Sequence, residues 1–311
     1  MKPSQSLYID VRGVRYHCRV WEPVADASCG QRADGQSQAP TLFMLHGWMD
    51  VSASFQFLVD ALSDDWRVVA PDWRGFGETD WNTGTSYWFP DYLADLEALL
   101  NYFQPDGQVN LLGHSMGGNI ASLYAGIRPA RVARLINVEG FGMRATVPAT
   151  APERYARWLD SLGQPPQLRA YASFEQLAER LQQQNPRQNA QRALFLARHW
   201  GAMNPSAESA DFEPVNRDRV RLRADPRHKL INPLLYQLEE AKACWQRVSA
   251  PVLWVTGSDT GTLAQLGIDA EEHRQRRLQF PRLQSLEIAD AGHMVHHDQP
   301  QALAQAIEKF L

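Results

Sequence analysis

Three residues in the segment NLLGHSMGGN have the spacing of a nucleophilic serine in a tight turn. Gly113, Ser115 and Gly117 fit the pattern G-x-S-x-G, the nucleophile elbow. Residues 108–114 predict a buried strand, and the apolar spacing over 119–127 predicts a helix. The flanking glycines avoid clashes in such a turn, and the helix N-terminus favours developing negative charge. Ser115 is therefore a candidate nucleophile, with an ordinary strand-to-helix turn as the alternative.

The segments around this turn alternate between strand and helix patterns. Strands are predicted at 41–47, 66–72, 132–140, 251–257 and 283–289, and helices at 86–103 and 301–311. Residues 7–13 and 14–22 predict a hairpin that turns at Arg12 and Gly13, and the polar segment 25–40 predicts a surface loop. This alternation predicts an α/β fold with a mostly parallel sheet covered by helices on both faces.

One long segment interrupts the alternation. Residues 141–244 contain no convincing strand pattern, whereas 153–162 and 173–184 have helical periodicity. The segment is too long for a crossover helix. We expect it to form a helical cap, inserted into a core made of residues 1–140 and 245–311, over the sheet edge where ligands bind in α/β folds.

Composition excludes several other classes of protein. The chain has 311 residues, 44% of them hydrophobic, and a net charge of −4 without a basic stripe, so nucleic acid is not an expected partner. No apolar run has the length of a membrane span, and the N-terminus lacks a secretion signal. Cys18, Cys29 and Cys244 have neither metal-ligand nor disulfide spacing. We expect reduced thiols, a cytoplasmic location, no metal and no cofactor.

Four segments together resemble the α/β-hydrolase family, and the resemblance covers essentially the whole chain. They are MLHGWMD, PDWRGFGETD, GHSMGG and DAGHMVHHDQP, and they occur in the family's order and spacing. The resemblance implies the α/β-hydrolase sheet with an inserted cap, and hydrolase activity.

A serine nucleophile needs an adjacent base, and His293 is the best candidate. It directly follows a predicted strand, and the order of serine before histidine is that of the α/β-hydrolase fold. His296 and His297 are expected to be solvated or structural. By resemblance, His46 shapes the oxyanion loop and does not act as a base.

The resemblance also implies the groups that would stabilise an oxyanion. These are the backbone N–H groups of Trp48, after the His-Gly pair, and of Met116, directly after the nucleophile. Trp73 and Arg74 are expected to be structural, with the Arg74 guanidinium holding its loop.

Two carboxylates remain candidates for the acid that orients His293. The family usually places an Asp after the seventh strand, three residues past a glycine, but Thr260 lies there after Gly257, and Asp259 lies one position early. Some members carry the acid after the sixth strand instead, where Glu139 lies. Both alternatives stay open, and the usual strand gives a small preference to Asp259.

The expected function is that of a serine hydrolase that cleaves a carboxylic ester or related acyl bond of a small molecule through an acyl-enzyme. One alternative is a carbon–carbon bond hydrolase of the same fold that acts on ring-cleavage products. A non-catalytic hydrolase-like binding protein is another. The sequence does not indicate the natural substrate, the acyl chain length or the oligomeric state.

Overall fold

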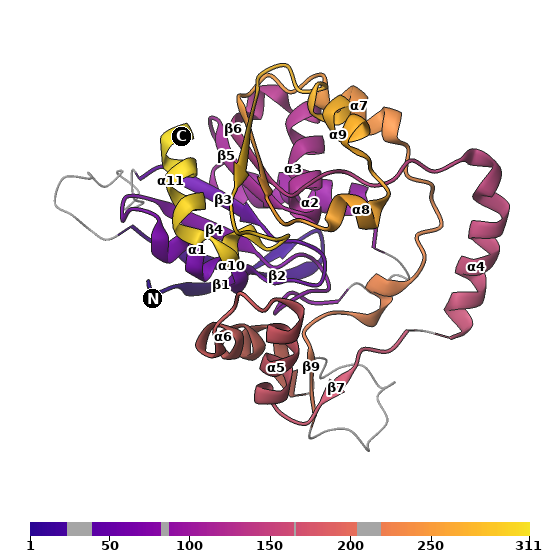
Figure 1. Ribbon diagram of the computed structural model, residues 1–311, viewed down its shortest axis with the longest axis horizontal. Helices are drawn as coiled ribbons and strands as arrows, with labels where there is room; N and C mark the ends of the chain where they lie inside the picture. The colour runs from indigo at the N-terminus through magenta and orange to yellow at the C-terminus, as the bar shows by residue number, and fades with distance from the viewer. Residues whose placement is uncertain (24–38, 82–86, 165, 204–218) are drawn as a thin grey trace.

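The fold is built on one mostly parallel sheet of eight strands. The computed structural model describes residues 1–23, 39–81, 87–164, 166–203 and 219–311. The strand order is β1-β2-β4-β3-β5-β6-β10-β11, and Figure 1 shows the sheet at the centre of the molecule. The strands are β1 (Gln5–Val11), β2 (Val14–Trp21), β3 (Thr41–Leu45), β4 (Arg67–Pro71), β5 (Val109–His114), β6 (Val132–Val138), β10 (Val252–Gly257) and β11 (Leu283–Ile288).

Only β2 runs against this direction. Strand β1 pairs with β2, and β2 with β4, in antiparallel register, whereas all pairs from β4 to β11 are parallel. The hairpin turns at Arg12 and Gly13, both with positive φ. The α/β architecture with a mostly parallel sheet, predicted from the sequence, is confirmed.

Two apolar cores lie on the two faces of the sheet. Along β3, Phe43 and Leu45 belong to one core, and Leu42 and Met44 to the other, because successive side chains of a strand point to opposite faces. Helices α2 (Phe89–Phe103), α3 (Met116–Ile127) and α7 (Leu238–Trp245) contribute buried side chains to the first core. Helices α1 (Gln56–Ala61), α10 (Val295–Asp298) and α11 (Pro300–Phe310) contribute to the second.

The described part of 141–244 folds into helices and a second, small sheet. Its helices are α4 (Ala151–Gly163), α5 (Phe174–Gln184), α6 (Ala190–Trp200) and most of α7. Strands β7 (Ala170–Tyr171), β8 (Gly201–Met203) and β9 (Val220–Leu222) form a sheet in the order β7-β9-β8. The expectation that this segment lacks strands was wrong, because strands of two or three residues are too short to show alternation.

Two helices of this segment lie in different surroundings. Helix α7 crosses the predicted boundary at residue 244 and packs against α3 of the sheet core. Helix α4 buries none of its side chains, and in Figure 1 it stands at the periphery, apart from the sheet. Apolar side chains on α4 are exposed, among them Tyr155, Leu159 and Leu162.

Among the described residues, no helix combines the length and apolar character needed to cross a membrane. Cys18 is buried and Cys244 half-buried, and both are free thiols. Cys29 and most of the predicted loop 25–40 lie outside the described residues.

Candidate active site

Ser115 lies in a strained turn between β5 and α3. Its backbone has φ 53° and ψ −115°, a conformation that L-residues rarely adopt. A Cβ at Gly113 would overlap the backbone of Gly117 and Gly118, and one at Gly117 would overlap the carbonyl of Leu45. Both glycines of the motif are therefore required for the close packing of this turn.

The other loops at this edge of the sheet share the same kind of strain. Five non-glycine residues of the described chain have positive φ, and four of them lie in these loops: Met49, Ser115, Glu139 and Asp290. Such strain persists only where the surrounding structure holds it, and it concentrates at functional sites.

His293 contacts both Ser115 and Glu139. Its Nε2 lies 3.0 Å from the Ser115 Oγ, and its Nδ1 lies 3.0 Å from the Glu139 Oε2. Because an ionised carboxylate only accepts hydrogen bonds, the Nδ1 carries the proton, and the Nε2 offers its lone pair to the serine hydroxyl. This arrangement can remove the proton from Ser115 as the hydroxyl attacks a carbonyl carbon.

Glu139 is fully buried and has two further donors. The backbone N–H of Gly257 donates to Oε1 at 2.9 Å, and the Thr260 hydroxyl donates to Oε2 at 2.5 Å. The Glu139 backbone N–H donates to Val255 on β10, which fixes the residue at the end of β6. The buried carboxylate is thus fully supplied with hydrogen bonds, as a buried charge must be.

Asp259 is turned away from His293. Its side chain is half-exposed, pairs with Arg187 and accepts a hydrogen bond from the Ser258 hydroxyl. Of the two carboxylates that the sequence left open, the structure brings Glu139 to His293 and leaves Asp259 outside. Thr260, at the family's usual acid position, instead donates its hydroxyl to Glu139.

The oxyanion loop is held by His46, which is fully buried. Burial lowers the pKa of His46 to about 4, so the imidazole is neutral near pH 7. Its Nε2 accepts from the Trp73 N–H at 2.9 Å, and its Nδ1 therefore donates to the Gly47 carbonyl at 2.7 Å. The bond fixes the peptide unit between Gly47 and Trp48, whose N–H is the expected oxyanion donor.

The two expected donor groups flank the nucleophile. A Cβ at Gly47 would lie 3.2 Å from the Cβ of Ser115, so the peptide that follows Gly47 borders the serine. Met116 is the first residue of α3, where backbone N–H groups have no partner inside the helix. The Trp48 side chain is 51% exposed.

Arg74 is buried and makes a two-pronged ion pair with Asp95. Its Nε and one terminal nitrogen lie 2.5 and 2.6 Å from the two carboxylate oxygens, and the Tyr16 hydroxyl donates to Asp95 at 2.5 Å. The pair connects the loop after β4 to helix α2. The sequence predicted the structural role of Arg74 but not its partner, because Asp95 carries no motif.

His296 and His297 are each 1% exposed, so of the two expected alternatives, solvated or structural, only the structural one holds. The Ser54 hydroxyl lies 3.1 Å from the His296 Nε2 and 2.6 Å from the His297 Nε2. Sequence analysis also did not single out Thr262, whose hydroxyl lies 3.0 Å from the His293 Nδ1. These contacts join segments distant in sequence, so no local pattern indicates them.

The sheet order, the serine elbow at the end of β5 and the histidine after the last strand define an α/β hydrolase. A family model of the alpha/beta hydrolase fold matches residues 40–300, and the chain belongs to this family. It is a hydrolase, because its family and its relatives are hydrolases.

The similar proteins include several named hydrolases. A serine hydrolase-like protein of Danio rerio is 26% identical over 288 residues, which cover 89% of this chain and 83% of that protein. The pimeloyl-[acyl-carrier protein] methyl ester esterase of Aeromonas hydrophila is 28% identical over 279 residues, or 88% of this chain and 96% of the esterase. The solved thioesterase domain from the curacin biosynthetic pathway has a TM-score of 0.80 at 22% identity, covering 98% of this chain and 99% of that domain. This last likeness concerns the fold.

Proposed function

We propose that the protein is a serine hydrolase that cleaves carboxylic esters or related acyl bonds through an acyl-enzyme. The observation that supports this most directly is His293, which lies 3.0 Å from both the Ser115 Oγ and the Glu139 Oε2. The similar methyl ester esterase of Aeromonas hydrophila favours an ester among the acyl bonds.

The reaction begins when the Ser115 Oγ attacks the carbonyl carbon of the substrate. His293 Nε2 takes the serine proton, and Glu139 stabilises the imidazolium that forms. The oxyanion accepts hydrogen bonds from the N–H groups of Trp48 and Met116, which are already in place and need no reorganisation. His293 then gives its proton to the leaving alcohol as the carbon–oxygen bond breaks, which leaves the acyl group on Ser115.

Water completes the cycle. His293 takes a proton from the water as its oxygen attacks the acyl carbon, and returns a proton to the Ser115 Oγ as the acid product leaves. In this mechanism the protein supplies the nucleophile, the base, the acid and the oxyanion donors from its own residues.

We further propose that residues 141–244 act as the cap that selects the substrate. Among the contacts that connect this segment to the core, Gly77 donates its N–H to the Arg223 carbonyl, and Phe76 forms a β-bridge with Ala224. Arg187, from the same segment, pairs with Asp259 in the loop after β10. A cap anchored at these points lies over the loops that carry the reacting groups.

A fluorophosphonate probe tests the nucleophile. We expect one covalent adduct per wild-type chain, located on Ser115 by mass spectrometry of the digested protein, and none on Ser115→Ala. A series of p-nitrophenyl esters of graded chain length then defines the acyl preference. Ser122, which is buried on α3, provides the matched control, because Ser122→Ala should still be labelled. Labelling that persists in Ser115→Ala would end the proposal.

A further inference from the structure

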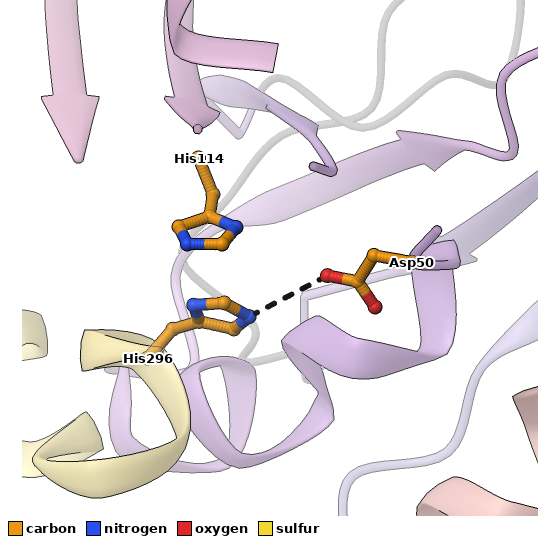
Figure 2. A group of neighbouring side chains, drawn as sticks. All are labelled: Asp50, His114 and His296. Carbon is orange, nitrogen blue, oxygen red and sulfur yellow. Dashed lines mark ion pairs between the residues drawn. The ribbon is translucent and has the colours of Figure 1, made fainter. Parts of the chain in front are cut away.

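Three buried side chains with metal-ligand chemistry converge behind the candidate active site. They are Asp50, His114 and His296, each at most 2% exposed, and Figure 2 shows them facing one another. Asp50 comes from the oxyanion loop, His114 from the last residue of β5, and His296 from helix α10 in the histidine loop. Three of the segments that carry the expected reacting groups, the oxyanion loop, the elbow and the histidine loop, thus each supply one residue to this cluster.

The ligand atoms lie close together. One atom from each of the three side chains can be chosen so that all lie within 4.8 Å of one another. The His296 Nε2 is 3.9 Å from the Asp50 Oδ2, along the dashed line of Figure 2, and the two imidazole rings have their centroids 4.5 Å apart. Ligands around a tetrahedral zinc ion are about 3.3 Å apart, so a modest contraction would complete the geometry.

His114 is held in the tautomer that a metal ligand needs. Its Nε2 lies 2.9 Å from the backbone carbonyl of His293, and a carbonyl only accepts, so the Nε2 carries the proton. The Nδ1 is then a bare lone pair, buried and without a hydrogen-bond partner among the described residues. A second nitrogen that donates to a backbone carbonyl is the usual support of a metal-bound histidine.

Asp50 presents one unsatisfied oxygen to the cluster. The Val51 N–H donates to Oδ1 at 2.8 Å. Oδ2 is buried without a well-aligned donor among the described residues, although the side chains of Ser54 and Trp200 lie close to the carboxylate. Burial raises the pKa of Asp50 to about 7. A cation next to Oδ2 would remove the cost of burying this charge.

His296 supplies the third ligand. When its Nε2 lone pair is offered to the cluster, the ring proton lies on Nδ1, which is buried without a hydrogen-bond partner among the described residues. Its Nε2 faces Asp50 and also lies 3.1 Å from the Ser54 hydroxyl, which can rotate to serve His297 alone.

We propose that Asp50, His114 and His296 form a binding site for one divalent transition-metal ion, such as Zn²⁺. Two imidazoles and one carboxylate are the ligand set that zinc and its neighbours prefer, whereas Mg²⁺ and Ca²⁺ prefer oxygen ligands alone. The ion would connect the oxyanion loop, the elbow and the histidine loop. The sequence predicted no metal, because it contains no motif with metal-ligand spacing. The three proposed ligands come from segments that are distant in sequence.

Zinc titration of the chelator-treated protein tests the site. We expect one Zn²⁺ per wild-type chain in competition with a chromophoric chelator, and a melting temperature that rises with Zn²⁺ but not with Mg²⁺. Asp50→Asn and His296→Gln should each weaken zinc binding at least tenfold and lose the rise in melting temperature. His297→Gln is the matched control, a buried histidine next in sequence that offers the cluster no ligand, and it should bind zinc as the wild type does.

Two results of the titration would contradict the proposed metal site. Equal zinc binding by the wild type and both ligand variants would assign the ion to other histidines of the chain. No binding at micromolar zinc would mean that a buried water, and not a metal, satisfies these atoms. If the variants fail to fold, anomalous scattering at the zinc edge from wild-type crystals decides, because the peak must lie between the three side chains. A peak elsewhere refutes the proposal.

Discussion

Glu139 is held at four points, three on β10 or the loop that follows it and one in the loop after β11. Its own backbone bonds to β10, its Oε1 accepts from Gly257, and its Oε2 accepts from Thr260 and His293. An acid so constrained can fix both the orientation and the tautomer of the imidazole. Asp259, half-exposed and paired with Arg187, has no such position.

This difference leads to a paired experiment on the two carboxylates. We expect Glu139→Gln to lower kcat by up to about four orders of magnitude, because an amide at this position no longer stabilises the imidazolium. Asp259→Asn should change kcat less than threefold, since an exposed ion pair contributes little. Both kcat and melting temperature should be measured for each variant.

Circular dichroism and the melting curve of Glu139→Gln show whether its loss of activity reflects the site or the fold. A large effect of Asp259→Asn, or two small effects, would mean that Glu139 is not the acid.

At the level of single residues, the sequence predicted those that sit in motifs. Ser115 and His293 follow from glycine spacing and strand context, and the structure brings them within hydrogen-bond distance. The acid could not be chosen, because Asp259 and Glu139 both follow predicted strands that end at the same edge. Which of them reaches His293 depends on the direction of each side chain in its loop, and no local pattern encodes that direction.

At the scale of elements, the elbow depends on close contact between the backbones of neighbouring segments. Gly117, in the first turn of α3, lies against the carbonyl of Leu45 at the end of β3. A side chain there would push the helix away from the strand and displace both the nucleophile and the oxyanion loop.

Gly117→Ala should therefore lower the melting temperature by several degrees and abolish labelling of Ser115 by the fluorophosphonate. Overpacking a well-packed site costs roughly 1–3 kcal/mol. Gly163→Ala is the control, because a Cβ at Gly163, the last residue of α4, meets no atom within 4 Å. Normal melting and labelling of Gly117→Ala would show that the elbow tolerates a side chain.

How well each helix or strand could be predicted depends on how clear its hydrophobic pattern is in the sequence. Strands β3, β5 and β10 are short apolar runs, and the sequence located them to within two residues at each end. Helix α9 (Ala270–Arg277) was not predicted, because it is mostly charged and has no apolar face. It buries only Arg276, which donates to the Phe141 carbonyl. Helix α4 was predicted from its periodicity, but periodicity does not say against what a helix packs, and α4 buries nothing in this chain.

At the scale of the whole molecule, buried neutral histidines set the response to acid. Burial is the largest cause of a lowered pKa in seven histidines of the described chain: His46, His114, His199, His228, His273, His296 and His297. In the unfolded chain each of them returns to an ordinary pKa of about 6.5. Below that pH the unfolded state binds protons that the folded state does not, so the free energy of unfolding falls as pH falls.

Asp50 reduces the proton uptake on unfolding. Its raised pKa of about 7 lets the folded state hold a proton that the carboxyl loses in the unfolded state. Seven histidines less one aspartate give a net uptake of roughly six protons on unfolding near pH 5. We expect the urea midpoint to fall steeply between pH 6.5 and 5, and the slope of the unfolding free energy against pH measures the proton uptake. A midpoint that stays constant over this range would show that these histidines are already protonated in the folded protein.

The hydrogen bond between Thr260 and Glu139 limits where a second carboxylate can lie. Thr260 occupies the position at which the resemblance to the family places the acid, and its hydroxyl donates to Glu139 at 2.5 Å. An ionised Asp at the same position could only accept hydrogen bonds. Thr260→Asp would therefore set two carboxylates against each other beside His293, and the pair would share one proton. One carboxylate and one neutral donor are the compatible pair at these two positions.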